Sequence, residues 1–304
     1  MTALLVGFDS AWAPTNSGAL VGVVRTNDGM FRELGLPQLV NYSEAESTIL
    51  DWQIRHQVES TAVLLDQPTI VKNVTGQRPV ENLVASPVSR RYGGIQPTNT
   101  ARTGMFGRDA PVWRFLERFG GPANPLEAVA GTRVFETYPV LTMIALGWTL
   151  PDKRPGGRLP KYNPGRRRTF SLSDWRHVCH QASLEFSARK FRQLVGWLDH
   201  LCASQAPRKA DQDRLDACLC LLVALYLIEE RECLMVGDLA TGYIVVPSAK
   251  VLCTELRASC GKTGREYGKW VRTFRRPSST VCSGRRHTAT DTECSAAGRI
   301  GVGG

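Results

Sequence analysis

The sequence predicts an α/β protein with a mixed central sheet, helices on both faces and loop insertions. Two apolar runs of strand length, residues 3–9 and 60–66, end in Asp9 and Asp66. Segments with helical spacing lie between and after such runs, as expected when helices cover a sheet. The longest of them, 209–230, is apolar at nearly every position after Leu215, which is the pattern of a helix buried on most sides. These features favour one α/β domain over residues 1–274.

Composition sets limits on the class of protein. The chain has 304 residues, 42% of them hydrophobic and 22% charged, which is ordinary for a globular protein. We expect no membrane segment and a cytoplasmic location, because there is no apolar run of about 18 residues and no signal-peptide pattern. The nine cysteines include no C-x-x-C pair. A net charge of +10 favours acidic partners, of which nucleic acid is the commonest.

The first 60 residues are predicted to form antiparallel strands followed by a helix. Residues 18–25 form a second apolar run that returns beside the first. The turn signal Asn27-Asp28-Gly29 leads into a short third strand near 30–34. Ser43 and Glu46 have the spacing of a capping box, so an amphipathic helix is expected over 43–57.

Residues 60–66 repeat the pattern of the first strand, because an apolar run again ends in an acid. A single Asp after a strand most often starts a turn. Ligand sites in open α/β sheets, however, lie outside the carboxyl ends of strands, which favours one shared site for Asp9 and Asp66. Residues 67–107 then form a predicted loop insertion. Its arginines could bind phosphates or be solvated at the surface; they include Arg78, Arg90, Arg91 and Arg102.

A third acid lies in a third β-rich segment. A helix is predicted over 109–119, and the segment 132–139 then carries Glu136 between Phe135 and Tyr138. These large neighbours predict that Glu136 is partly buried. A buried carboxylate needs a cation, a metal or hydrogen-bond donors as its partner.

A basic loop insertion is predicted over residues 151–170. Its glycines, prolines and Tyr162 among cations would suit a phosphate backbone with a base stacked nearby. A loop that merely improves solubility is the alternative. The cations, opposed only by Asp152, are Lys153, Arg154, Arg158, Lys161, Arg166, Arg167 and Arg168.

The last third of the chain contains the helix that carries further acids. A helical region is expected over 173–203, followed by the helix 209–230, two short strands near 233–247 and a helix over 249–260. Asp213 and Asp216 are three residues apart and share one face of the helix, where they could cap it or bind a metal. Asp211 is the best candidate for an ordinary cap. Residues 275–304 are predicted to be a disordered basic tail.

Six motifs in this order resemble the domain of unknown function family DUF429, a group of predicted RNase H-like nucleases. The resemblance covers roughly residues 3–274. The motifs are Gly7-Phe-Asp9, Leu65-Asp66-Gln-Pro68, Val134-Phe-Glu136-Thr-Tyr-Pro139, Arg158-Leu-Pro-Lys-Tyr162, Asp213-Arg-Leu-Asp216-Ala217 and Gly242-Tyr-Ile-Val-Val-Pro247.

The resemblance implies an RNase H-like fold and a nuclease that cleaves phosphodiester bonds with two Mg²⁺ or Mn²⁺ ions. The implied catalytic residues are Asp9, Asp66, Glu136, Asp213 and Asp216, and the implied metal ligands are Asp9, Asp66, Glu136 and Asp216. The basic residues of both insertions would bind the substrate's phosphates. One alternative is a module of this fold that binds nucleic acid or protein without catalysis. Another is a phosphotransferase of the related sugar-kinase fold, whose phosphate loops the sequence lacks.

Overall fold

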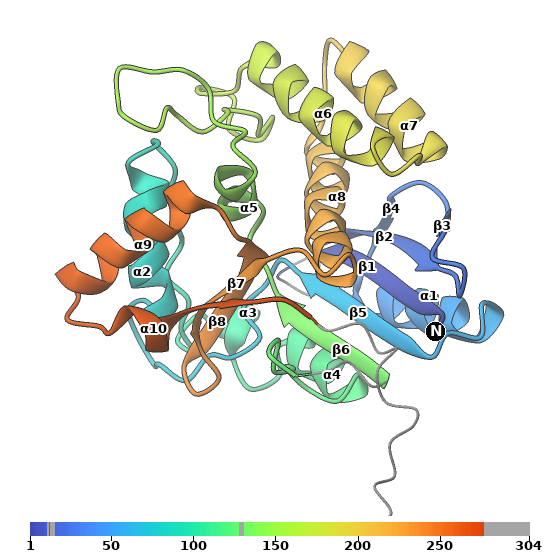
Figure 1. Cartoon of the computed structure of the whole chain (residues 1–304), viewed down its shortest axis with the longest axis horizontal. Coiled ribbons are helices and arrows are strands. Elements are labelled where there is room, and N and C mark those ends of the chain that lie inside the picture. Colours follow the sequence, from blue (N-terminus) through green and yellow to red (C-terminus); the bar gives the residue numbers. More distant parts are fainter. Residues whose placement is uncertain (11, 13–15, 128–130, 277–304) are drawn as a thin grey trace, which may run out of the picture.

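A mixed sheet of six strands forms the centre of the structure, a computed structural model that describes residues 1–10, 12, 16–127 and 131–276 (Figure 1). β1 (Ala3–Asp9) pairs antiparallel with β2 (Gly18–Arg25) and parallel with β5 (Ser60–Leu65). β5 in turn pairs parallel with β6 (Gly131–Glu136). The short strands β3 (Phe31–Glu33) and β4 (Gln38–Val40) both pair with β2. The predicted mixed α/β sheet is confirmed.

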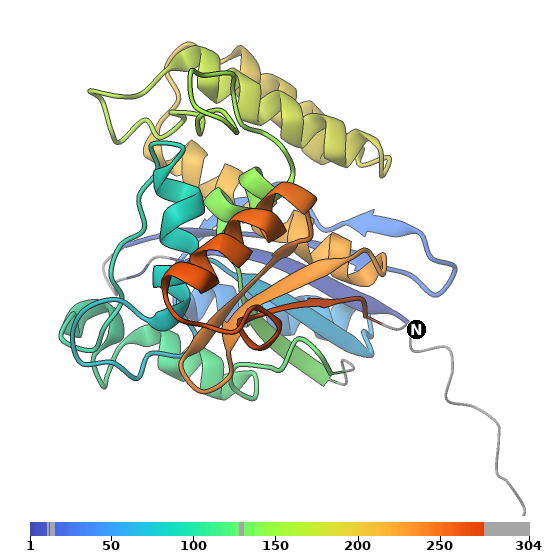
Figure 2. The same ribbon diagram turned by 60° about the vertical axis from the view of Figure 1, so that its left-hand side comes forward.

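Helices cover both faces of this sheet, as predicted. α8 (Lys209–Ile228) lies on one face, and α1 (Tyr42–Arg55) and α4 (Pro111–Arg118) lie on the other (Figure 2). Alternation along β1 separates the two cores: Leu5 packs on the α8 side and Leu4 on the α1 side. Because both faces of β1 and β2 are covered, these two strands are apolar along most of their length.

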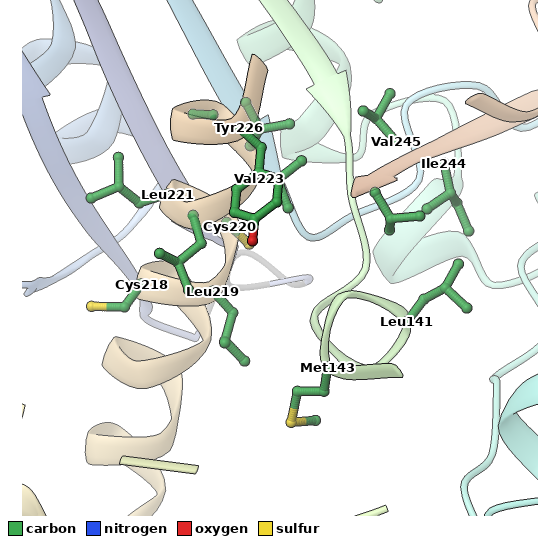
Figure 3. Close-up of a cluster of buried hydrophobic side chains, with 14 of the residues drawn as sticks. Leu141, Met143, Cys218, Leu219, Cys220, Leu221, Val223, Tyr226, Ile244 and Val245 are labelled. Carbon is green, nitrogen blue, oxygen red and sulfur yellow. The ribbon is translucent and has the colours of Figure 1, made fainter. Parts of the chain in front are cut away.

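α8 is buried along nearly its whole length, which explains its apolar sequence. The helices α6 (Leu172–Ser187) and α7 (Arg192–Ala203) form a hairpin whose apolar side chains share a core with it. Figure 3 shows side chains of α8 gathered with those of α5 (Pro139–Ala145) and of strand β8 (Gly242–Pro247). Cys218 and Cys220 are fully buried members of this cluster. Both thiols therefore act as small apolar groups.

A second sheet follows α8 in the chain. β7 (Cys233–Asp238) pairs antiparallel with β8 and with β9 (Val271–Phe274). Between β8 and β9 lie α9 (Lys250–Lys262) and the short α10 (Tyr267–Trp270), and α9 runs beside α2 (Pro79–Ser89) (Figure 1). Among the helices described, none combines the length and the apolar character needed to cross a membrane.

Several elements differ from the prediction. The insertion 67–107 was predicted to be a loop, but it contains α2 and α3 (Thr103–Phe106). Its prolines were interpreted as signs of a loop. Pro79 is compatible with α2 because the first turn of a helix needs no partner for its backbone nitrogen. Pro139 was predicted to close a segment, and for the same reason it begins α5.

Two helix boundaries also differ. The capping box of α1 is formed by Asn41 and Glu44 rather than Ser43 and Glu46, because Asn41 lies directly after β4 and meets the helix first. The predicted helical region 173–203 is two helices, separated at Lys190, which has a φ of 63°. The predicted tail from 277 onward lies outside the described residues.

Candidate active site

Asp9 and Asp66 stand side by side at the ends of two parallel strands. β1 and β5 pair in parallel up to Phe8 and Leu65, and the next residue after each of these is an acid. The backbone nitrogen of Asp66 donates to the carbonyl of Phe8 at 2.9 Å, which extends the ladder to this point. Phe8 and Leu65 both belong to the core on the α1 side. Strand alternation therefore turns both acids toward the face covered by α8.

The residues that follow these acids are fixed by a small polar network. The hydroxyl of Ser10 donates to Oε1 of Gln67 at 2.5 Å, and the hydroxyl of Tyr42 donates to the same oxygen. The indole nitrogen of Trp12 donates to the carbonyl of Asp66 at 2.9 Å. Since Ser10 and Gln67 directly follow the two acids, this network holds the two strand ends together.

α8 approaches β1 closely because β1 carries a glycine at the crossing point. A Cβ atom on Gly7 would lie 2.1 Å from the carbonyl oxygen of Ala217 and 2.4 Å from the backbone nitrogen of Leu221. Any larger residue would therefore push the helix away from the strand. The close contact brings Asp216, one residue before Ala217, to the strand end that carries Asp9.

Two neutral groups hold the carboxylate of Asp216. The hydroxyl of Tyr162 donates to Oδ1 at 2.7 Å, and the side-chain amide of Gln212 donates to Oδ2. Tyr162 was predicted to stack near a base, but its ring is buried and its hydroxyl is used by this bond. The remaining atom of the amide, Oε1 of Gln212, has no hydrogen-bond partner in the described structure although Gln212 is 93% buried.

Burial and the charges of neighbouring acids raise the pKa values of all three acids. Burial, followed by the charges of Asp216 and Asp66, raises the pKa of Asp9 well above its ordinary value. Burial, followed by the charge of Asp216, does the same to the pKa of Asp66. The pKa of Asp216 is raised by burial to about 6, although Tyr162 and a nearby lysine act to lower it. These directions identify a buried cluster of acids with too little positive charge to balance it.

Lys209, in the first turn of α8, supplies positive charge at the edge of this cluster. Its ammonium group forms an ion pair with Asp213. Burial acts to lower the pKa of Lys209, but the bond with Asp213 and the charge of Asp216 raise it overall. Asp211 caps the helix, since it accepts a hydrogen bond of 2.8 Å from the backbone nitrogen of Arg208.

The carboxylate of Glu136 is paired with an arginine, although its charge also raises the pKa of Asp66. Both its oxygens accept hydrogen bonds from Arg78, at 2.6 and 2.9 Å, and one also accepts from the backbone nitrogen of Thr69 at 2.9 Å. The register explains this position: Glu136 is level with Leu65 rather than with Asp66, so alternation does not direct it toward α8 with the other acids. Burial still raises its pKa, against the lowering effect of Arg78.

A cavity of about 600 Å³ opens beside these acids. Asp66 and Asp216 line it, together with Glu136 and its partner Arg78. Residues of both insertions form much of the remaining wall, together with residues of α5 and Ile244 of β8, and apolar side chains such as Ile95 are among them. A cavity of this size lies in the range typical of small-molecule sites, roughly 300–1,000 Å³.

Several of the predicted phosphate-binding cations have structural partners. Arg91 is buried and forms two hydrogen bonds with Glu255, at 2.7 and 2.9 Å. Arg158 pairs with Asp174, with one hydrogen bond of 3.0 Å. These two arginines therefore connect the insertions to the helices behind them.

Other predicted cations bind backbone carbonyls. Lys161 donates to the carbonyl of Tyr92 at 2.6 Å, and Arg154 lies over the ring of Tyr92 at 3.9 Å. Arg102 donates to the carbonyl of Pro97 at 3.0 Å and to the side chain of Gln96 at 3.2 Å. Arg166 lines the cavity, and its guanidinium has no partner among the described residues. The remaining cations are exposed: Arg90, Lys153, Arg167 and Arg168.

Sequence reasoning missed three contributors to the site. Gln212 and Lys209 lie four and seven residues before Asp216, so helical spacing could have placed Gln212 on the same face. Gly7 was noted only as part of a motif, and no local signal indicates that a helix crosses there.

In the described part of the chain, no group of three or more His, Cys, Asp or Glu side chains is arranged so that it could hold a metal ion.

Comparison with known proteins gives one match. No curated protein matches the chain significantly. The model of the family described as "Protein of unknown function (DUF429)" matches residues 7–239, which include both strand-end acids, Glu136 and the whole of α8. Since the match covers well over half of the chain, the protein belongs to the DUF429 family.

Proposed function

We propose that this protein is a metal-dependent nuclease of RNase H-like type that hydrolyses phosphodiester bonds. The observation that carries the proposal is the set of three buried carboxylates, Asp9, Asp66 and Asp216, which the ends of β1 and β5 and the helix α8 bring together beside a cavity. Their pKa values are all raised, chiefly by burial. Perturbed acids in a cleft are typical of catalytic sites. The net charge of +10 supports nucleic acid as the partner. A cytoplasmic location stays a prediction.

The donor set of the acid cluster fits Mg²⁺ or Mn²⁺ in chemistry. Asp9, Asp66 and Asp216 offer hard oxygen atoms, which these ions prefer. The donors on Asp216 are neutral, and each carboxylate oxygen keeps a second lone pair when it accepts one hydrogen bond. As they stand, the side chains do not form a complete cage for an ion. A bound divalent ion would supply positive charge that activates water and stabilises the leaving oxygen.

The residues around these three acids would have supporting roles. Tyr162 and Gln212 keep the carboxylate of Asp216 in one orientation, as hydrogen-bonding partners of metal ligands commonly do. Asp213, which contacts Lys209, is the remaining acid for proton transfer, because Glu136 is paired with Arg78. In the reaction, water adds to phosphorus and the bond to the leaving sugar oxygen breaks. That oxygen leaves with a proton, so the products are a phosphomonoester and an alcohol.

Titrating Mg²⁺ and Mn²⁺ with labelled single-stranded DNA, duplex DNA, RNA and hybrid tests this proposal. We expect metal-dependent cleavage that falls at least 100-fold in Asp9→Asn, since this acid would bind the ion directly. Asp211→Asn is the matched control, because Asp211 caps α8 and pairs with Arg214 at the edge of the helix, and this variant should cleave as wild type does.

Two outcomes would contradict the assignment. Cleavage that survives Asp9→Asn would show that the reaction occurs elsewhere. Nucleic-acid binding without cleavage, at any metal concentration, would instead favour a binding module of the same fold.

A further inference from the structure

We propose that the cavity admits one unpaired nucleotide at a time and excludes paired duplex. This inference rests on the proposed function, because it names the substrate class of the same site. The expected ligand carries a phosphate ester joined to a flat, partly apolar base. A free nucleotide and the end of a single strand both present it.

The size of the cavity is the first argument. Its volume of about 600 Å³ matches one ligand of the size of a mononucleotide. A paired duplex keeps each base stacked between neighbours, so only an unpaired nucleotide can enter a pocket of this size without unstacking.

The two insertions close one side of the cavity and are bound to each other. The backbone nitrogen of Leu159 donates to the carbonyl of Arg91 at 3.0 Å. Arg91 in turn donates to the carbonyl of Gly156 at 3.1 Å, and Arg154 donates to that of Arg90 at 3.1 Å. These bonds tie residues 90–92 to residues 154–161. A duplex laid across the acids would have to break this wall.

The lining of the cavity matches the parts of a nucleotide. Ile95, Tyr138 and Val140 line the cavity and are only half-buried, so they offer apolar surface suited to a base. Asp66 and Asp216 lie in the same cavity, where the phosphate ester would react. Arg166 lines it as well and has no partner in the described structure, so its guanidinium is available for a phosphate.

One buried polar atom of the lining also lacks a partner. Oε1 of Gln212 is an acceptor without a donor, although the residue is 93% buried. Buried acceptors are almost always satisfied, so this atom indicates a missing donor. A hydroxyl or amino group of a nucleoside is such a donor. Gln212 lies four residues from Asp216, so the donor would be held near the reacting phosphate.

Binding measured with the Asp9→Asn protein tests this inference without requiring cleavage. Adenosine 5′-monophosphate, a labelled single-stranded dinucleotide and a blunt 12-base-pair duplex are compared by calorimetry and fluorescence anisotropy. We expect the nucleotide or the dinucleotide to bind at least tenfold more tightly than the duplex. Tighter binding of the mononucleotide would identify the ligand as a free nucleotide. Tighter binding of the dinucleotide would identify it as the end of a single strand.

Arg166→Gln should weaken this binding about tenfold, because it removes the unpaired guanidinium. Arg114→Gln, on the exposed surface of α4 across the sheet, is the charge-matched control and should change it less than twofold. Duplex binding equal to or tighter than that of the single strand would overturn the inference, as would the absence of any nucleotide binding.

The two proposals fail in distinguishable ways. If the wild type cleaves a blunt duplex at internal positions with metal, the nuclease proposal stands and the proposal of a single-nucleotide cavity is rejected. Tight nucleotide binding without cleavage of any substrate would retain the cavity and reject the nuclease.

Discussion

Replacing Asp216 with asparagine is expected to stabilise the metal-free protein at neutral pH. The residue is only 5% exposed, and burial raises its pKa to about 6. Asparagine has nearly the same shape without the charge. The hydroxyl of Tyr162 can donate to the asparagine oxygen as it now does to the carboxylate. The amide of Gln212 can turn over, so that its unpartnered Oε1 accepts a hydrogen bond from the new amide nitrogen.

The magnitude follows from the raised pKa. In the unfolded chain an Asp has a pKa of about 3.9, so between the two values the folded protein binds more protons than the unfolded chain. The stability that this group contributes is therefore complete below about pH 4 and is lost as the pH rises through about 6. The loss amounts to roughly 3 kcal/mol above pH 7 and about half of that at pH 5. Asp216→Asn should recover this amount.

Urea unfolding in EDTA, followed by tryptophan fluorescence at pH 5, 6, 7 and 8, measures the effect. Asp211→Asn is the matched control on the same helix, since Asp211 caps α8 through the backbone nitrogen of Arg208. Its free energy of unfolding should differ from that of the wild type by less than about 1 kcal/mol at every pH.

Added Mg²⁺ provides a second readout of the same variant. An ion that binds only the folded protein stabilises it by about 2.7 kcal/mol at 100 times its Kd. We expect this gain in the wild type and its loss in Asp216→Asn, so the difference between the two proteins narrows. The reasoning is refuted if Asp216→Asn is less stable than the wild type at pH 8 in EDTA. It is also refuted if the gain at pH 5 equals the gain at pH 8.

Two further predictions concern the packing that positions the acids. Gly7→Ala should destabilise the protein by about 1–3 kcal/mol and weaken metal binding, because its Cβ would overlap the backbone of α8. Urea unfolding and calorimetry measure both effects, and Gly196→Ala, whose Cβ meets no atom within 4 Å, should be neutral or stabilising. Arg78→Gln should cost about 3–5 kcal/mol, because it removes the cation that pairs with the buried carboxylates of Glu136 and Glu81. Chemical unfolding beside Arg114→Gln checks this, and equal stability of the two variants would contradict it.

The acids at the two strand ends could be located from sequence because their signal is local. Asp9 and Asp66 each end an apolar run, and parallel strands of one sheet bring such ends together. Asp216 was identifiable because a helix with apolar residues on every side must lie against the sheet. In these cases the residue and the pattern that places it lie within about 20 positions of each other.

The pairing of Glu136 could not be predicted, because its partner Arg78 lies 58 positions away in an insertion. The sequence did indicate that this buried carboxylate needs a partner, but not whether the partner is an arginine or a metal. The position of Tyr162 was hidden for a similar reason. Its nearest neighbours in the chain are a lysine, an asparagine and prolines, whereas its contact with Asp216 depends on how the basic insertion folds back onto α8.

α8 can hold an electrostatically unfavourable acid because the rest of its surface is buried in apolar contacts. From Leu215 to Leu227, every residue is buried. Each large apolar side chain stabilises the fold by about 1.5–3 kcal/mol, so a few of them outweigh the roughly 3 kcal/mol lost through Asp216. The same burial that anchors the helix raises the pKa of its acid. At this position, a change that increases the stability of the metal-free protein therefore decreases its affinity for a cation. A variant of Asp216 that is more stable should bind metal less tightly.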